Sequence, residues 1–414
     1  MFKKIIIAAF LLLSIVSFAQ QSTASTYSQY GIGDVRFKGT VENRLMGGVA
    51  VFPDSIHINI QNPASYSNLK LISFTIGSDF NSTKLNSYKG NAKTKRAALD
   101  YMALAIPTGK KSGFGLGLIP YSSVGYKIRT VDAVGIINKF EGSGGLNKVF
   151  VGYGYKINSS LSIGADVNYN FGRIITTNIQ KVPNILYGDE EVNVSEMSGF
   201  NVNIGGMFQR KINKKLDFYG SLTYSPESNL KSKNERITSS VQYTNDFTNI
   251  VDQQVVINSK NNLKLPSKFA IGAGFGQNKK WLLGTEVTLQ QSSSMSNRFS
   301  DVTNATFENA IKYSVGGYYI PNYNSFSNYF KKITYRAGFR YENTGLVIKN
   351  ESIKDYAFTG GFGLPLSGTF SNLNMGVEYG RRGTAKANLV QENYTTIIIS
   401  LSFNDKWFVK RKFD

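Results

Sequence analysis

The chain contains no cysteine, only 9 prolines and 2 tryptophans, and a single histidine among its 414 residues. Without cysteine, disulfides cannot stabilise an exported protein, so stability must come from hydrogen bonds and burial. After residue 19 no apolar run reaches the about 20 residues that a transmembrane helix needs. If the mature chain lies in a membrane, a closed β-barrel is therefore the remaining architecture.

The same scarcity argues against catalysis and against a bound metal. His57 is the only histidine, so it is the only candidate for a His base that would activate serine or water. With one histidine and no cysteine, ordinary zinc sites are excluded. We expect His57 to have a structural role. Residues 189–191 (Asp-Glu-Glu) form an acidic cluster that we interpret as a solvated charge run, with a weak calcium site as the alternative. We expect no catalytic residue, no metal and no cofactor.

The N-terminus has the three parts of a secretory signal peptide. Lys3 and Lys4 precede an apolar stretch at residues 5–16, and Ser17-Phe18-Ala19 places small residues where a signal peptidase reads them. The apolar stretch is too short to span a bilayer, although a retained anchor is the alternative. We expect cleavage after Ala19 and export of the mature chain.

Alternation of apolar and polar residues indicates strands along nearly the whole mature chain, which is rich in Gly, Tyr and Phe (40, 24 and 28 residues). In residues 397–403, for example, Ile397 and Ile399 alternate with Ile398 and Ser400. Segments of about ten residues with this period are typical of transmembrane barrels. A soluble β-sandwich is the alternative, but its polar face would carry more Lys and Glu.

Connection lengths predict how many strands there are. Six short and seven long connections join about fourteen strands between residues 71 and 404, and an even count places both termini on the periplasmic side with the short turns. The sequence thus predicts an all-β, antiparallel transmembrane barrel. The long connections are expected near residues 82–96, 129–145, 180–197, 230–265, 293–309, 345–354 and 383–391.

With the apolar faces turned toward lipid, the opposite faces define the expected lumen. Acids outnumber bases there, and we interpret these charges as ion pairs that fill the lumen, with a polar path as the alternative. The predicted lumen residues are Asp100, Lys156, Asp166, Asp217, Glu286, Arg336, Arg340, Glu342 and Glu378.

The mature chain divides into three parts after the signal peptide at residues 1–19. Residues 20–70 are rich in glycine and too apolar to be solvated, so we expect them to form a hatch inside or beneath the barrel. Residues 71–404 form the barrel, and residues 405–414 are a basic tail. The hatch ends in Asn62-Pro63-Ala64, just ahead of the first strand.

A glycine-rich N-terminal segment followed by Asn62-Pro63-Ala64 resembles the FadL-type channels for hydrophobic compounds. Leu265-Pro266 before a strand and Trp281 at the start of the next extend the likeness. The resemblance implies fourteen strands, an N-terminal hatch and a kinked third strand that opens the wall, a position matched by Pro120 with Gly125. A simple rim bulge is the alternative at Pro120.

The C-terminal part resembles FadL-like outer-membrane proteins of Bacteroidota, on residues 361–365, 378–383 and 407–410. Some relatives of that kind are subunits of the type IX secretion translocon, including one that plugs its pore. Two functions therefore stay open: a passive channel for hydrophobic small molecules, and a protein-binding accessory or plug subunit of a secretion translocon.

The net charge of the chain indicates which partners to expect. The formal charge is +20, or +18 without Lys3 and Lys4, which suggests polyanionic neighbours. We expect outer-membrane lipid and lipopolysaccharide, or a large translocon barrel, and no nucleic acid. The basic tail is the expected partner-binding segment, through Lys406, Lys410, Arg411 and Lys412.

Overall fold

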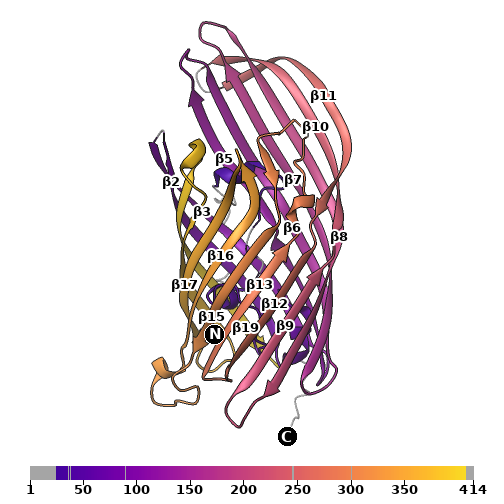
Figure 1. The fold of residues 1–414 in the computed structure, drawn as a ribbon, viewed down its shortest axis with the longest axis vertical. Helices are drawn as coiled ribbons and strands as arrows, with labels where there is room; N and C mark the ends of the chain where they lie inside the picture. The colour runs from indigo at the N-terminus through magenta and orange to yellow at the C-terminus, as the bar shows by residue number, and fades with distance from the viewer. Residues whose placement is uncertain are drawn as a thin grey trace.

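The structure is a computed structural model that describes residues 25–35, 37, 39–88, 90–244, 247–299 and 301–406. The expected signal peptide and most of the expected basic tail, including Lys410, Arg411 and Lys412, lie outside the described residues. Within them the chain forms a barrel of tilted antiparallel strands around an N-terminal segment (Figure 1). No helix among the described residues is long and apolar enough to cross a membrane.

Fourteen strands form the barrel wall, and each pairs with its neighbours in chain order. The last pairs with the first along its whole length, from Gln391 opposite Asn86 to Asp405 opposite Ile72, and this closes the barrel. The predicted all-β fold and strand number are thus confirmed. The wall strands are β2 (Ile72–Ser87), β3 (Gly90–Pro107), β4 (Ser112–Pro120) with β5 (Ser122–Val131), β6 (Ile137–Lys156), β7 (Leu161–Lys181), β8 (Tyr187–Lys211), β9 (Asp217–Ser225) with β10 (Ser228–Thr244), β11 (Phe247–Leu265) with β12 (Lys268–Gln277), β13 (Trp281–Gln290), β15 (Ala310–Tyr319), β16 (Thr334–Ile348), β17 (Glu351–Pro365), β18 (Asn372–Arg382) and β19 (Gln391–Asp405).

Three of these fourteen strands are interrupted, and each interruption carries a proline. Pro120 ends β4, Pro226 lies between β9 and β10, and Pro266 lies between β11 and β12. Proline has no N–H to give to a ladder, so the strand breaks or bends there. Each interrupted strand therefore carries two strand labels, so the labels exceed the number of wall strands. A separate label also goes to β14 (Ala305–Phe307), a three-residue strand that pairs with the end of β16.

The side chains alternate between the two faces as the sequence predicted. Ile399 is 40% exposed on the outer face and Ile398 is fully buried inside. The predicted lumen residues Asp100, Asp166 and Glu378 are likewise buried. Outside, exposed aliphatic and aromatic side chains of most wall strands form an apolar belt that suits lipid.

The predicted long loops are wrong at several positions, where the strands themselves continue. Residues 230–265, expected as a single long connection, are mostly the paired strands β10 and β11. Residues 82–96 likewise form the paired end of the β2–β3 hairpin. Beyond the apolar belt polar residues occupy the outer face as well as the inner one, as Lys231 and Lys233 do beside Ser232 and Asn234, so the alternation fades from the sequence while the hydrogen-bonded ladder persists.

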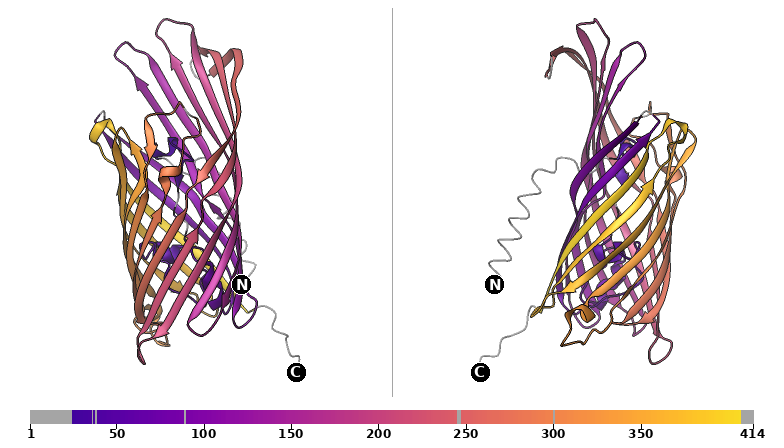
Figure 2. Two further views of the ribbon diagram at one scale, coloured as in Figure 1. Left: turned by 45° about the vertical axis from the view of Figure 1, so that its right-hand side comes forward. Right: turned by 90° about the vertical axis from the view of Figure 1, so that its left-hand side faces the viewer.

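The wall is uneven in height. On one side β6, β7, β8, β10 and β11 rise well above the strands near the C-terminus (Figures 1 and 2). We call this the long-strand end. At the opposite, short-turn end, six connections join the strands in the places that the sequence predicted. Five of them have three to six residues, and residues 320–333 form a longer one.

Residues 25–71, here called the inner segment, lie inside the barrel (Figures 1 and 2). Val41 and Leu45 of this segment pack with wall residue Ile398 in one buried cluster, and Val51 and Phe52 pack with Tyr219 in another. The wall therefore takes much of its inner packing from this segment. Its elements are η2 (Thr26–Gln29), β1 (Asp34–Val35), α2 (Val41–Arg44) and η3 (Pro63–Asn68).

Candidate functional site: the lumen and the broken wall strand

A buried ion-pair network joins the inner segment to the wall. Arg44, at the end of α2, donates to Asp79 and Asp100 at 3.1 Å each and to Glu378 at 2.7 Å. These carboxylates come from β2, β3 and β18 and would repel one another without a cation. Burial alone would lower the pKa of Arg44, but the three carboxylates raise it above its ordinary value. The guanidinium is thus held in its charged form.

The network continues around the lumen through a second arginine. Arg340 of β16 donates to Glu378 at 2.8 Å and lies 3.5 Å from Asp355 of β17. Tyr394 of β19 donates to Asp355 at 2.7 Å. The predicted interior ion pairs therefore exist, and they connect strands on the side where the barrel closes.

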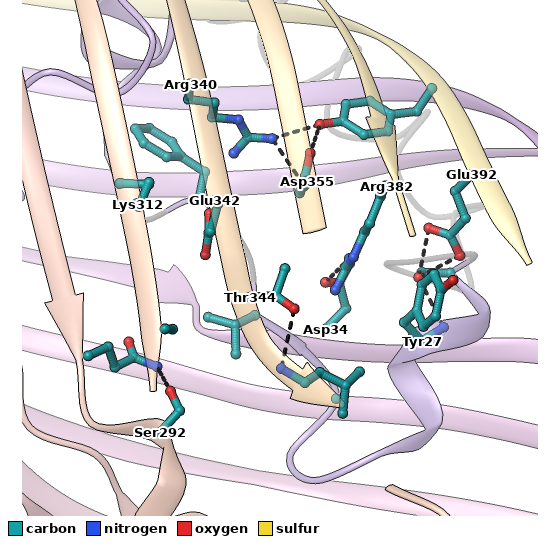
Figure 3. Close-up of a pocket in the computed structure, with 18 of the residues that line it drawn as sticks. Tyr27, Asp34, Ser292, Lys312, Arg340, Glu342, Thr344, Asp355, Arg382 and Glu392 are labelled. Atoms are coloured by element: carbon teal, nitrogen blue, oxygen red, sulfur yellow. Dashed lines mark hydrogen bonds and ion pairs between the residues drawn. The ribbon is translucent and has the colours of Figure 1, made fainter. Parts of the chain in front are cut away.

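Next to the network is a cavity of about 240 Å³. Its lining mixes both signs of charge, and Lys312, Glu342 and Arg382 point into the same space (Figure 3). Such a lining favours water and polar solutes over an oily molecule. Charged side chains therefore line part of this cavity beside the network.

Asn62, Pro63 and Ala64 lie where the inner segment packs against β7 and β8. The Asn62 side chain accepts from the Ala64 N–H at 3.1 Å and caps η3, while its amide donates to the Gly206 carbonyl at 3.1 Å. A Cβ added at Gly164 would lie 2.5 Å from the Pro63 backbone. Glycine at that position lets the inner segment lie directly on the wall.

The third wall strand breaks where Pro120 ends β4. The ladder between β3 and β4 runs from Pro107 to Met102 and stops there. Beyond the break β5 pairs with β6, and its start pairs with the inner segment, Ser123 with Asp34 and Ser122 with Val35. At this position the inner segment, through β1, supplies the pairing partner for the start of wall strand β5.

Residues 25–35, here called the strap, hold this position with further bonds to β5. The Ser122 hydroxyl donates to the Ile32 carbonyl at 2.6 Å, and the Gly125 N–H donates to the Ser28 hydroxyl at 3.2 Å. Gly125, expected at a wall kink with Pro120, is thus a contact point of the strap. The strap covers the edge of β5 next to the broken ladder.

The other side of the strap is tied to the last two wall strands. Ser25 and Thr26 donate to the Glu392 carboxylate at 2.8–3.0 Å. Arg382 of β18 pairs with Asp34 at 2.5 Å (Figure 3). The strap therefore bridges the lumen from β5 to β18 and β19.

An apolar cluster lies beside the broken strand. Ile32 of the strap and Val124 of β5 pack with Ile174, Met197 and other buried residues of the strands that rise toward the long-strand end. Arg298, from the connection after β13, donates to the Gly31 carbonyl at 2.9 Å and fixes the strap against this cluster. Apolar side chains therefore lie next to the wall break, while charged ones lie along the axis.

The other candidate residues are apart from this site. His57 lies in the inner segment with its Nδ1 at 2.9 Å from Asp54, and Glu191 accepts from Asn193 at 2.6 Å. Lys406 lies over the Phe370 ring at the short-turn end, 5.8 Å from its centroid. Among the described residues no group of three His, Cys, Asp or Glu side chains could hold a metal.

Sequence reasoning missed Arg44 and Glu392. The partners of Arg44 lie between 35 and 334 positions away along the chain, so no local pattern marks them. One signal was present: acids outnumber bases in the predicted lumen, which requires a cation from elsewhere. The inner segment supplies it.

Comparison with known proteins agrees with this architecture. The BamG family model matches residues 1–414, and no curated protein sequence matches the chain significantly. The P. putida toluene transporter TodX is similar in structure, with TM-score 0.58 at 14% identity over 89% of this chain and 99% of that one.

Two further solved structures are similar to the same extent. The CymD monoaromatic hydrocarbon channel gives TM-score 0.55 at 12% identity, over 92% of this chain and 99% of that one. A Pseudomonas aeruginosa FadL homologue gives TM-score 0.54 at 13% identity, over 90% of this chain and 98% of that one. At such identities the likeness concerns the fold, and it agrees with the FadL-type resemblance of the sequence.

Proposed function

The chain belongs to the BamG family, and we propose that it is a non-enzymatic outer-membrane β-barrel that passes hydrophobic molecules passively through its wall. In this proposal the short-turn end and both termini face the periplasm, as is usual for such barrels. The inner segment acts as a hatch that closes the axis. The strap closes the break in the third wall strand.

The observation that carries the proposal is the end of the β3–β4 ladder at Met102, beside the apolar cluster around Val124. A hydrophobic molecule that enters from the long-strand end meets apolar side chains and then the broken wall. Along the axis it would meet the charges of Arg44 and Glu378 instead, which disfavours its passage. The apolar route thus leads sideways toward lipid.

The structural neighbours support the same class of substrate. TodX is described as a toluene transporter and CymD as a monoaromatic hydrocarbon channel. By analogy of fold, a small aromatic hydrocarbon such as toluene is a suitable first probe for this chain.

The test uses the absence of cysteine. Val35 of the strap lies opposite Ser122 of β5, and directly opposed antiparallel residues lie at about the distance a disulfide spans. In the Val35→Cys/Ser122→Cys variant, oxidation locks the strap to β5. We expect toluene uptake by cells that express this variant to fall several-fold on oxidation and to recover on reduction.

A matched control places the disulfide away from the break. Ser239 and Gln253 are opposite each other on β10 and β11, and the Ser239→Cys/Gln253→Cys variant should be insensitive to oxidation. Equal uptake by oxidised and reduced strap variants, with complete cross-linking, would remove the support for a wall route.

A protein-binding role is the second candidate. The observation that favours it is the long-strand end, where Ile185, Leu186, Ile250 and Val255 are each more than half exposed beyond the apolar belt. Affinity purification from detergent-solubilised membranes tests this role, because a large barrel partner in stoichiometric yield favours it and a lone barrel favours the channel.

A further inference from the structure

The short-turn end carries a repeated charge pattern. Lys-Lys occurs in four of its six turns, at residues 110–111, 214–215, 279–280 and 331–332, and none of the six turns contains Asp or Glu. We call these eight residues the lysine rim. All are exposed except Lys332, which is half-buried. Because the four turns follow different strand pairs, the rim spreads around the barrel instead of forming one patch.

The rim lies close to the edge of the apolar belt. Lys280 directly precedes Trp281, Lys215 lies three residues before the outward Phe218, and Lys332 lies three residues before the outward Tyr335. At about 3.3 Å per residue, the backbone of each of these three lysines lies within about 10 Å of the backbone of an aromatic residue at the strand end. Aromatic side chains at barrel ends lie at the headgroup level of the bilayer. The lysines therefore lie at the height of lipid phosphates.

Exposed aromatic side chains share this end of the barrel. Phe326, at 98% exposure, and Phe330, at 69%, belong to the turn before β16, the orange turn at the lower left of Figure 1. Lys332 lies 5.6 Å from the Phe326 ring centroid, and Lys279 lies 4.4 Å from that of Tyr323 in the same turn. Cations placed over amphipathic rings suit an interface where apolar chains meet charged headgroups.

From these observations we propose that the lysine rim binds anionic phospholipid, with phosphatidylglycerol as the probe, in the leaflet at the short-turn end. The spread of the lysines around the barrel and their height favour headgroups over a protein, which would need one coherent patch. In the orientation proposed above this is the periplasmic leaflet. The inference does not depend on the channel function.

The experiment measures lipid selectivity of the full mature chain. The barrel is reconstituted in bilayers of phosphatidylcholine and phosphatidylglycerol and extracted mildly, and the retained lipids are counted by native mass spectrometry. Each lysine at an anionic surface favours binding by about fivefold. We therefore expect several-fold enrichment of phosphatidylglycerol, and a decrease as salt rises and the Debye length falls from about 10 Å at 0.1 M to about 3 Å at 1 M.

Two sets of eight Lys→Gln substitutions identify the end that is responsible. The rim variant changes all eight rim lysines and should lose the enrichment. The control variant changes eight exposed lysines outside the short-turn end and should keep it: Lys84, Lys93, Lys95, Lys231, Lys233, Lys260, Lys349 and Lys386. Heat-modified gel mobility verifies that each barrel is folded. If the rim variant does not fold, single-turn pairs such as Lys279→Gln/Lys280→Gln provide the same comparison with a smaller expected loss.

Two results would overturn the proposal. One is undiminished phosphatidylglycerol enrichment in the folded rim variants, and the other is an equal loss in the control. If the rim variant keeps its lipids but loses an acidic protein that co-purifies with the wild type, the rim is a protein-binding surface instead.

Discussion

Ile398 and Ile399 are consecutive residues on opposite faces of the wall, the first fully buried against the inner segment and the second 40% exposed on the outer face. This relationship gives a direct test of how the barrel lies in lipid. Ile399→Lys places a charge on the lipid face and should cost about 2–4 kcal/mol of barrel stability near the midplane. The loss is measured as a lower urea midpoint for refolding into vesicles.

The substitution at the neighbouring position has a different consequence. Ile398 packs with Val41 and Leu45, so Ile398→Lys should loosen the inner segment more than the wall. Limited proteolysis of residues 25–71 reads this out, while heat-modified gel mobility reports on the wall. Should Ile398→Lys and Ile399→Lys behave alike in both assays, the assignment of faces is wrong.

Arg44 should be essential for keeping the inner segment in place. Arg44→Met leaves Asp79, Asp100 and Glu378 buried near one another without their shared cation. Removal of one partner from a buried ion pair costs about 3–5 kcal/mol. We expect faster proteolysis of residues 25–71 in a barrel that still assembles, and partial rescue by Arg44→Lys. Unchanged protection in Arg44→Met would contradict this role.

Deletion of residues 21–60 tests the hatch as a whole. The truncated barrel should assemble and should conduct ions more strongly in planar bilayers, because the polar lumen then fills with water. The full-length chain measured in parallel is the reference. Equal conductance of the two would show that the inner segment does not occlude the axis.

Stability of the inner segment should depend on pH through His57. Burial by itself lowers the pKa of His57, but the Asp54 carboxylate at 2.9 Å and Glu42 raise it above its ordinary value of about 6.5. Because the pKa of His57 is higher in the folded chain than in the unfolded chain, this stabilisation is complete below about pH 6.5. It is lost as the pH rises through the pKa of the folded state. Protease protection of residues 25–71 should therefore weaken toward alkaline pH. In His57→Gln, protease protection should no longer depend on pH in this way. Constant protection of the wild type from about pH 6 to about pH 9 would contradict the prediction.

The basic tail separates the two candidate functions. Replacement of Lys406, Lys410, Arg411 and Lys412 by Gln removes four charges outside the wall strands. Under the protein-binding role, co-purification of a large partner should fall and should be salt-sensitive in the wild type. Under the channel role, toluene uptake should not change. A barrel that fails to assemble would assign the tail to folding.

The sequence predicted the repetitive part of the structure well. Period-two alternation identified the face of Ile399, and turn residues located all six connections of the short-turn end. It failed where side chains no longer face lipid on one side. The β10–β11 hairpin was taken for a loop because both faces of β10 carry polar residues: Lys231 and Lys233 are exposed outside, and Ser232 and Asn234 are buried inside. This removes the alternation from the sequence but not the ladder.

The candidate site was less predictable because it depends on contacts between distant parts of the chain. Pro120 marks the strand break in the sequence, since proline cannot serve in a ladder. The pairing of Asp34 with Ser123 could not be found in this way, because two residues are too few to form a pattern. The same holds for Glu392, whose partners Ser25 and Thr26 lie at the other end of the chain.

The ties between the strap and the last strands constrain the order of assembly. Ser25 and Thr26 are made early in synthesis, yet their acceptor Glu392 belongs to the last strand. Arg44 likewise joins β2 and β3 to β18. If β2 and β19 had already paired, some fifty residues would have to enter the closed barrel through its end. We therefore expect the seam between β2 and β19 to close around a segment already in place, which makes this segment a template for the final folding step.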